Sequence, residues 1–203
     1  MNDKQTDKKK WVRKAGNVLF LGLVLLLLLS PSAKGWLLRQ LMAVGLFEAE
    51  IKKEAPVTKL GAAATAFSFR DEKGAIVSTA DLKDKIVFIN FWATWCPPCI
   101  AEIPSLNDLY NQLRDDEQFV FLFINEDEDV AKAETFLQKG GYSLPLMTRA
   151  GSIPADIYSG TLPTTVVLNK EGKIVFKHEG LAKYNSTTFI NQLKALLKPS
   201  INR

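Results

Sequence analysis

Residues 86–104, IVFINFWATWCPPCIAEIP, decide how this chain folds, and they contain both of its cysteines, Cys96 and Cys99. The apolar run at the start of this stretch predicts a strand that is buried on both faces of a sheet. Pro97 and Pro98 predict the start of a helix, because the first helical turn has no amide hydrogen bonds to lose. The two cysteines are therefore expected between the end of a strand and the start of a helix.

The cysteine pair could bind a metal, cross-link the fold or act as a redox reagent. A structural zinc site needs about four ligands, and beyond the pair the chain offers one histidine, His178. A disulfide that closes a two-residue gap restricts the unfolded chain very little, so it would add little stability. Cys96 lies directly before the predicted helix, where unpaired amides and the helix dipole favour a thiolate. These points favour a dithiol that exchanges two electrons, with Cys99 the more buried partner.

The chain beyond residue 60 alternates between predicted strands and helices. Residues 66–78 predict a hairpin that turns at Gly74. The later elements are a strand at 82–92, a helix from Pro97, a strand at 119–125, a helix at 127–141, a short strand at 144–147, a short helical piece at 153–160, a hairpin at 164–180 and a C-terminal helix at 186–198. This alternation predicts an α/β domain whose parallel or mixed sheet is covered by helices on both faces.

The motifs resemble a known family. W-C-P-P-C after an apolar strand, with T-L-P-T-T at 161–165 and VVLNKEGKIV at 166–175, resembles the thioredoxin fold. More narrowly, NFWATWCPPC with Glu102 and Pro104 is similar to the W-C-x-P-C-x-x-E-x-P pattern of the TlpA/ResA group, membrane-anchored thiol-disulfide oxidoreductases with a redoxin (AhpC-TSA-like) domain. The resemblance covers roughly residues 60–198. It implies a central mixed sheet flanked by helices, with an N-terminal hairpin and a helix–strand insert around 126–147.

The resemblance also implies roles for single residues. Cys96 would be the attacking thiol and Cys99 the resolving thiol of a redox-active disulfide. Trp95 would cover the start of the active-site helix. Pro163 would be a cis-proline that faces the disulfide, and Leu162 before it would offer its backbone to the substrate strand.

Two further polar residues follow from the same comparison. Glu102 matches the acidic residue that the group keeps near its cysteines, and partial burial would raise the pKa of this carboxyl. Glu102 is therefore expected to be catalytic, as a relay for the proton of the buried thiol. Asn90 stands where ordinary thioredoxins keep a buried aspartate, which makes Glu102 the replacement proton acceptor.

The function implied is that of an extracytoplasmic disulfide reductase without a cofactor or bound metal. Its partners would be a protein substrate with a disulfide, in cytochrome c maturation or another process, and a membrane electron donor of the DsbD/CcdA type. The direction stays open at this point, because disulfide-forming oxidants share the fold and the known potentials span about −270 to −120 mV.

Three other functions fit the residues less well. A Sco-like copper-delivery module would use His178 with the cysteines, but it spaces its cysteines by three residues. A peroxiredoxin needs threonine and arginine beside its cysteine, where this chain is apolar. The acidic run at 126–129 could suggest calcium, although acidic residues at a helix start are also stabilised by the helix dipole.

The charge of the chain is concentrated at its N-terminus. Six basic and two acidic residues lie in 1–14, so this segment carries +4, which is the formal net charge of all 203 residues. The remainder is formally neutral and offers no basic surface for nucleic acid. Residues 15–33 contain no charged residue, and as a helix they would rise about 28 Å.

This pattern predicts four segments. They are a basic cytoplasmic tail at 1–14, a transmembrane anchor at 15–33, an interfacial helix and tether at 34–59, and the thioredoxin-like domain at 60–203, which is expected in the periplasm. A cleaved signal peptide is the alternative for the N-terminus, but Pro31 would lie at −3 of a cut after Ala33. A helix docked on the domain is the alternative for the apolar residues at 35–47.

Overall fold

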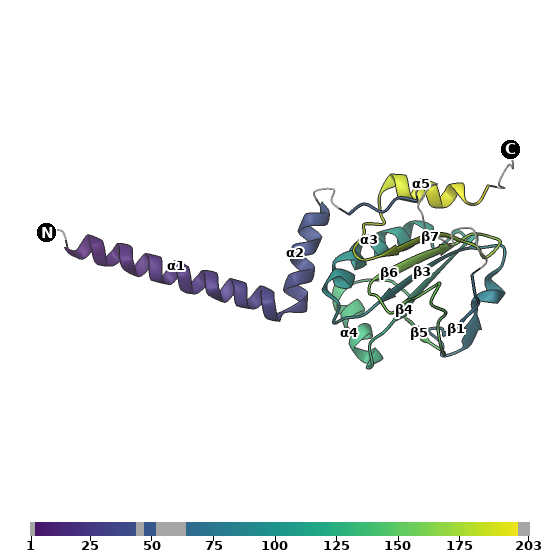
Figure 1. Cartoon of the computed structure of the whole chain (residues 1–203), viewed down its shortest axis with the longest axis horizontal. Coiled ribbons are helices and arrows are strands. Elements are labelled where there is room, and N and C mark those ends of the chain that lie inside the picture. The colour runs from purple at the N-terminus through teal and green to yellow at the C-terminus, as the bar shows by residue number, and fades with distance from the viewer. Residues whose placement is uncertain (1–2, 44–46, 52–63, 199–203) are drawn as a thin grey trace.

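The computed structural model describes residues 3–43, 47–51 and 64–198. Within these residues a seven-stranded sheet has the order β2-β1-β5-β4-β3-β6-β7 (Figure 1). The strands are β1 (Ser68–Arg70), β2 (Ile76–Ser78), β3 (Ile86–Trp92), β4 (Phe119–Asn125), β5 (Met147–Arg149), β6 (Thr164–Leu168) and β7 (Ile174–Glu179). β4 is parallel to both β3 and β5, and the other neighbours are antiparallel. The predicted α/β fold with a mixed sheet is confirmed.

The helices of the domain are α3 (Pro97–Leu113), α4 (Val130–Gly140) and α5 (Thr187–Ala195), with a 3-10 turn η1 (Thr79–Leu82). The N-terminal hairpin is β1–β2, and the insert is α4–β5. Three expectations were wrong in detail. The strand expected at 82–92 begins only at Ile86, because Leu82 ends η1. The short strand lies at 147–149 instead of 144–147. Residues 153–160 form only one turn, in which the amides of Ile157 and Tyr158 both donate to the carbonyl of Pro154, and no helix continues from it.

Strand β3 lies at the centre of the core, and all seven of its residues are buried. Side chains alternate along a strand, so Phe88 and Trp92 join the larger apolar cluster, which also contains buried residues of α3 and α5. Ile89 and Phe91 join the cluster on the opposite face, to which α3, α4 and α5 contribute no buried residue. The expectation of helices on both faces of the sheet is therefore wrong for the described residues. Asn90 belongs to the first set by its parity, so its amide enters the core on the side of the sheet covered by α3.

The N-terminal residues form two helices, α1 (Asp3–Leu29) and α2 (Pro31–Ala43), where one transmembrane helix was predicted at 15–33. Pro31 has no amide hydrogen to continue α1 and instead begins α2. The uncharged part of α1 therefore ends at Leu29 and rises about 22 Å, less than the roughly 30 Å of a hydrocarbon core. Across the described residues, no helix has the length and apolar character to cross a membrane. The predicted transmembrane helix is not supported.

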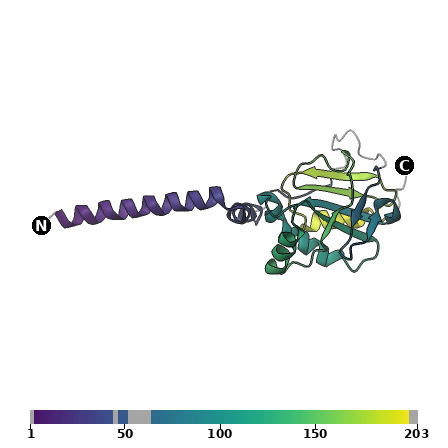
Figure 2. The ribbon, with the colours of Figure 1, turned by 90° about the horizontal axis from the view of Figure 1, so that it is seen from below.

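Helix α1 projects away from the domain, and α2 lies between α1 and the domain in both views (Figures 1 and 2). α2 rests on the first turns of α3, as the docked alternative predicted. A Cβ added to Gly35 would be 2.9 Å from Cγ2 of Ile100 and 3.2 Å from the carbonyl oxygen of Pro97. Gly35 therefore lets the two helices approach closely.

A proline within α3 provides the polar part of this contact. Pro104 has no amide hydrogen, so the carbonyl of Ile100, four residues earlier, has no donor within the helix. The Arg39 guanidinium donates to that oxygen at 3.4 Å. The proline of the motif thus leaves an acceptor on α3 that α2 uses.

The chain after α2 returns to the domain at Phe47. The amide of Lys183 donates to the carbonyl of Phe47, and the amide of Ala49 donates to the carbonyl of Lys183 at 2.9 Å. Ala49 is buried in the core. Residues 48–51 of the predicted tether are thus attached to the domain, while 52–59 lie outside the described residues.

Candidate active site

Cys96 and Cys99 form a disulfide where β3 ends and α3 begins. Cys96 is the N-cap residue of α3, and the amide of Cys99 donates to its sulfur at 3.3 Å. Pro97 occupies the first helical position, which needs no amide donor. Cys99 is fully buried, whereas 4% of Cys96 is exposed. Cys96, the cysteine with the greater exposure, therefore lies at the positive end of the helix dipole, where a thiolate would be stabilised.

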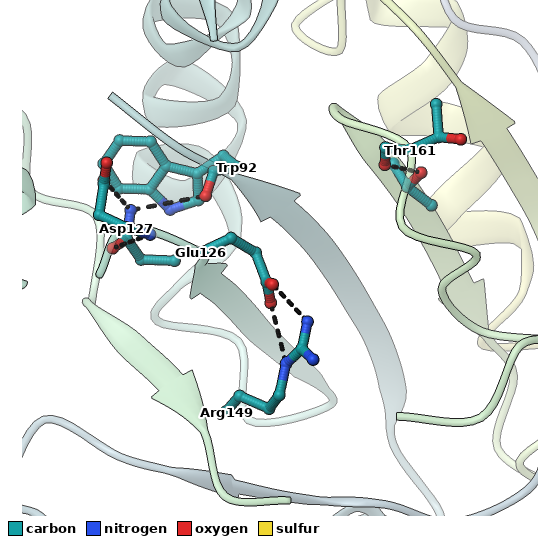
Figure 3. A network of polar contacts seen from close by, with 7 residues as sticks. Trp92, Glu126, Asp127, Arg149 and Thr161 are labelled. Atoms are coloured by element: carbon teal, nitrogen blue, oxygen red, sulfur yellow. Dashed lines mark hydrogen bonds and ion pairs between the residues drawn. The ribbon is translucent and has the colours of Figure 1, made fainter. Parts of the chain in front are cut away.

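The residues predicted to bind substrate lie beside the disulfide or at the same edge of the sheet. Trp95 precedes Cys96 and is 59% exposed. The peptide bond between Leu162 and Pro163 is cis. Phe91 pairs with Thr164 between antiparallel β3 and β6, so the cis-proline enters β6 where β3 ends. The hydroxyl of Thr164 closes this turn by donating to the carbonyl of Thr161 at 2.7 Å (Figure 3).

Glu102 is a fully buried carboxyl on α3, one turn after Cys99. It accepts hydrogen bonds from the Asn90 amide at 2.8 Å and from the backbone amide of Ala182 at 3.4 Å. Burial raises the pKa of Glu102 to about 8, and the two hydrogen bonds offset only part of that rise. Glu102 is consequently protonated at neutral pH in this oxidised state.

Asn90 connects Glu102 to a second buried group. Its side-chain nitrogen also donates to the hydroxyl of Thr165 at 2.9 Å. Tyr184 is a further buried group near Glu102. Burial, reinforced by the Glu102 carboxyl, raises the pKa of Tyr184 well above its usual value. The predicted relation between Asn90 and Glu102 thus takes the form of a direct hydrogen bond in an apolar core.

Sequence reasoning missed Asp127, which holds the loop before the cysteines. Its carboxylate accepts hydrogen bonds from the Thr94 amide at 3.0 Å and the Thr94 hydroxyl at 2.8 Å. It also accepts one from the Asn125 side chain at 2.8 Å. Figure 3 shows this carboxylate beside Trp92 at the end of β3. Thr94 and Asp127 are 33 residues apart, so no local spacing in the sequence indicates the contact.

The other acids of the run at 126–129 have separate roles. Asp129 is the N-cap of α4 and accepts from the amide of Ala131 at 3.1 Å, so the helix-start explanation applies to this residue. Glu126 instead forms an ion pair with Arg149 of β5 (Figure 3). No set of three or more histidine, cysteine or acidic side chains in the described parts of the chain is arranged to hold a metal ion.

His178, the histidine considered for copper, lies on β7. Its Nε2 is 3.4 Å from the carbonyl oxygen of Leu181, and its ring stacks on Phe176 with 6.3 Å between centroids. These contacts account for the histidine as a packed residue of the strand.

Comparison with known proteins gives consistent matches. Residues 60–177 match the profile of the AhpC/TSA family. The thiol-disulfide oxidoreductase ResA of Halalkalibacterium halodurans is 32% identical over 145 residues, which are 70% of this chain and 80% of that protein. ResA of Bacillus subtilis is 31% identical over 140 residues, 68% of this chain and 76% of that protein.

A solved structure shows the same architecture. It is the thiol:disulfide interchange protein, thioredoxin family protein, of Chlorobium tepidum, with a TM-score of 0.56 and 25% identity. The match covers 71% of this chain and the whole of that structure.

Proposed function

Because the chain belongs to the AhpC/TSA family and, within it, to the thiol-disulfide oxidoreductases of the ResA type, we propose that it works as a reductase of protein disulfides. The observation that carries this proposal is a disulfide at the start of α3 with a buried, protonatable Glu102 on the same helix. A buried acid supports a thiol pair that must exchange protons as well as electrons.

The reaction begins with the reduced pair. The Cys96 thiolate attacks one sulfur of the substrate disulfide, which forms a mixed disulfide and releases the other substrate sulfur as a thiolate. Cys99 then attacks the sulfur of Cys96, which displaces the second substrate thiolate and leaves the Cys96–Cys99 disulfide. Two electrons pass from the enzyme to the substrate.

Glu102 provides a place for the proton of Cys99. Cys99 is fully buried in the oxidised structure, and burial in apolar surroundings raises the pKa of a thiol. The ionised fraction of Glu102 would accept the proton as Cys99 attacks, and this leaves Glu102 protonated, as expected of the oxidised state with its pKa of about 8. When a donor reduces the disulfide again, the proton would return to the Cys99 sulfur.

The surface around Cys96 supports a macromolecular substrate. Trp95 is exposed beside the disulfide, and aromatic side chains offer large contact area at low entropic cost. The Leu162–Pro163 segment borders the same edge. We propose that a substrate strand lies along this segment while Trp95 covers its apolar side chains.

The reduction potential of the full chain tests the direction of electron flow. The protein is equilibrated in buffers of defined thiol–disulfide ratio and the fraction oxidised is measured. A potential near or below about −250 mV supports a reductase, whereas a value above about −150 mV would show a disulfide-forming oxidant. In a separate turnover assay, replacing Cys96 with serine should abolish the reduction of any disulfide.

The proposed place of action is outside the cytoplasm, with cytochrome c maturation as a candidate process and a membrane protein of the DsbD/CcdA type as electron donor. The support is the uneven charge: residues 1–14 carry +4, which is the net charge of the whole chain, and residues 15–203 are formally neutral. Labelling Cys96 in intact cells with a membrane-impermeant thiol reagent tests the location. Labelling only after cell lysis would contradict it.

A further inference from the structure

Asp127 joins the insert of the domain to the loop that carries Cys96. Its carboxylate accepts both the amide and the hydroxyl of Thr94, and Thr94 lies two residues before the reactive cysteine. Charge-assisted hydrogen bonds of this kind are shorter and about twice as strong as neutral ones. Asp127 therefore binds one residue of the loop through two donors at once.

The loop has few other backbone hydrogen bonds to hold it. The amide of Cys96 donates to the carbonyl of Ala93 at 3.3 Å. Pro97 and Pro98 follow directly and have no amide hydrogen to donate. Because these two positions cannot donate, the loop between β3 and α3 is held by the Cys96 amide and by the two Thr94 donors that Asp127 accepts.

Asp127 is itself held in place by its own neighbours. The amide of Glu126 donates to the carbonyl of Trp92 at 2.9 Å, and the amide of Asp127 donates to the Asn125 side chain at 3.1 Å. The Glu126 carboxylate is paired with Arg149. The acceptor is therefore fixed to the end of β4 and to β5, two strands of the rigid sheet (Figure 3).

The guanidinium of Arg149 extends this support to the far side of the sheet. It lies 5.7 Å from the centre of the Tyr158 ring, and Tyr158 stacks on Phe91 of β3 at 4.3 Å. A continuous set of contacts thus leads from the core of β3, through Tyr158 and Arg149, to the segment that carries Asp127.

We propose that Asp127 is a positioning residue of thiol-disulfide exchange, which fixes the loop at 93–96 so that the Cys96 sulfur meets the substrate disulfide in line. In that step the bond from Cys96 to one substrate sulfur forms while the sulfur–sulfur bond of the substrate breaks. The attack needs a near-linear arrangement of three sulfurs, and a misplacement of about 1 Å can cost roughly 100-fold in rate. This inference rests on the proposed exchange chemistry and adds the residue that aligns it.

The test compares Asp127→Ala with Asp129→Ala in the full chain. Both variants remove an aspartate from the same acidic run, but Asp129 caps α4 and does not contact the loop. Asp127→Ala should lower the kcat/KM for reduction of a protein disulfide by roughly 10- to 100-fold, mainly through kcat. Asp129→Ala should change it by less than about twofold and lower stability by about 1 kcal/mol.

A second readout separates positioning from damage to the thiol. Iodoacetamide alkylates Cys96 from many directions, so the alkylation rate of reduced Asp127→Ala should stay within about threefold of the parent protein. A fall in both rates by the same factor would mean that the thiol itself has changed. Exchange by Asp127→Ala as fast as that by Asp129→Ala would overturn the proposal.

Two milder variants keep the test decisive if Asp127→Ala does not fold. Thr94→Val removes the hydroxyl donor and keeps the amide, and Asp127→Asn keeps one acceptor oxygen. Each should reduce kcat by a smaller factor than Asp127→Ala does. The kcat of the double variant should fall by less than the product of the two single factors, because both changes affect one contact. Factors that multiply independently would show that Thr94 and Asp127 do not act together.

Discussion

Replacing Glu102 with glutamine should remove a pH dependence from the stability of the oxidised protein. Burial raises the folded-state pKa of Glu102 from 4.5 to about 8, so the folded protein binds this proton more tightly than the unfolded chain. The stabilisation from the bound proton is complete below about pH 4.5 and is lost as the pH rises to about 8. The difference between the two pKa values, 4.5 and about 8, corresponds at about 1.4 kcal/mol per pKa unit to a loss of about 5 kcal/mol in the free energy of unfolding over that window.

The Glu102→Gln variant has no such titration. Glutamine has a single carbonyl oxygen, so it can accept the hydrogen bond from the Asn90 amide but loses the one from the amide of Ala182. The loss of stability from that missing hydrogen bond does not vary with pH. Urea unfolding of the oxidised parent and variant is measured from pH 4.5 to 9. Relative to the difference at pH 4.5, the free energy of unfolding of the variant should exceed that of the parent by about 3 kcal/mol at pH 7 and by about 5 kcal/mol above pH 8. Two curves that stay parallel across this range would refute the reasoning.

Three more results are expected. Asn90→Ala removes the hydrogen bond that lowers the pKa of Glu102, so the inflection in the same stability curve should move above pH 8; a shift to lower pH would contradict the assignment. Cys99→Ser should accumulate a covalent mixed disulfide between Cys96 and the substrate, detected by mass spectrometry and released by dithiothreitol; its absence with Cys96 fully reduced would argue against Cys99 as the resolving thiol. Gly35→Val places a Cβ about 2.9 Å from Cγ2 of Ile100 and should detach α2, so trypsin should cut at Arg39 faster than in the Gly22→Val control, where the added Cβ would have nothing within 4 Å.

The central strands could be predicted from the sequence because each is a continuous apolar run with a single structural solution. β3 and β4 need burial on both faces, and the runs at 86–92 and 119–125 satisfy that need without help from their neighbours. The short strand β5 begins three residues later than predicted, because its position depends on pairing with β4 and β1. The transmembrane helix predicted at 15–33 is not supported for a related reason, because Pro31 divides this uncharged stretch between α1 and α2.

Glu102 and the cis bond before Pro163 were expected only from the resemblance to the TlpA/ResA group. The cysteine pair could be predicted from local signals, a strand end and a helix start with two prolines. Asp127 and Arg39 could not, because each acts on a partner far away in the chain. Both partners are backbone groups close to the cysteines, the amide of Thr94 in the loop before Cys96 and the carbonyl of Ile100, which Pro104 leaves without a helical donor. A motif rich in proline creates unpaired backbone groups by its own composition. The residues that bind backbone groups of this motif are therefore where further contributions to the active site are expected, and Asp127 is the one whose partner, Thr94, lies two residues from Cys96.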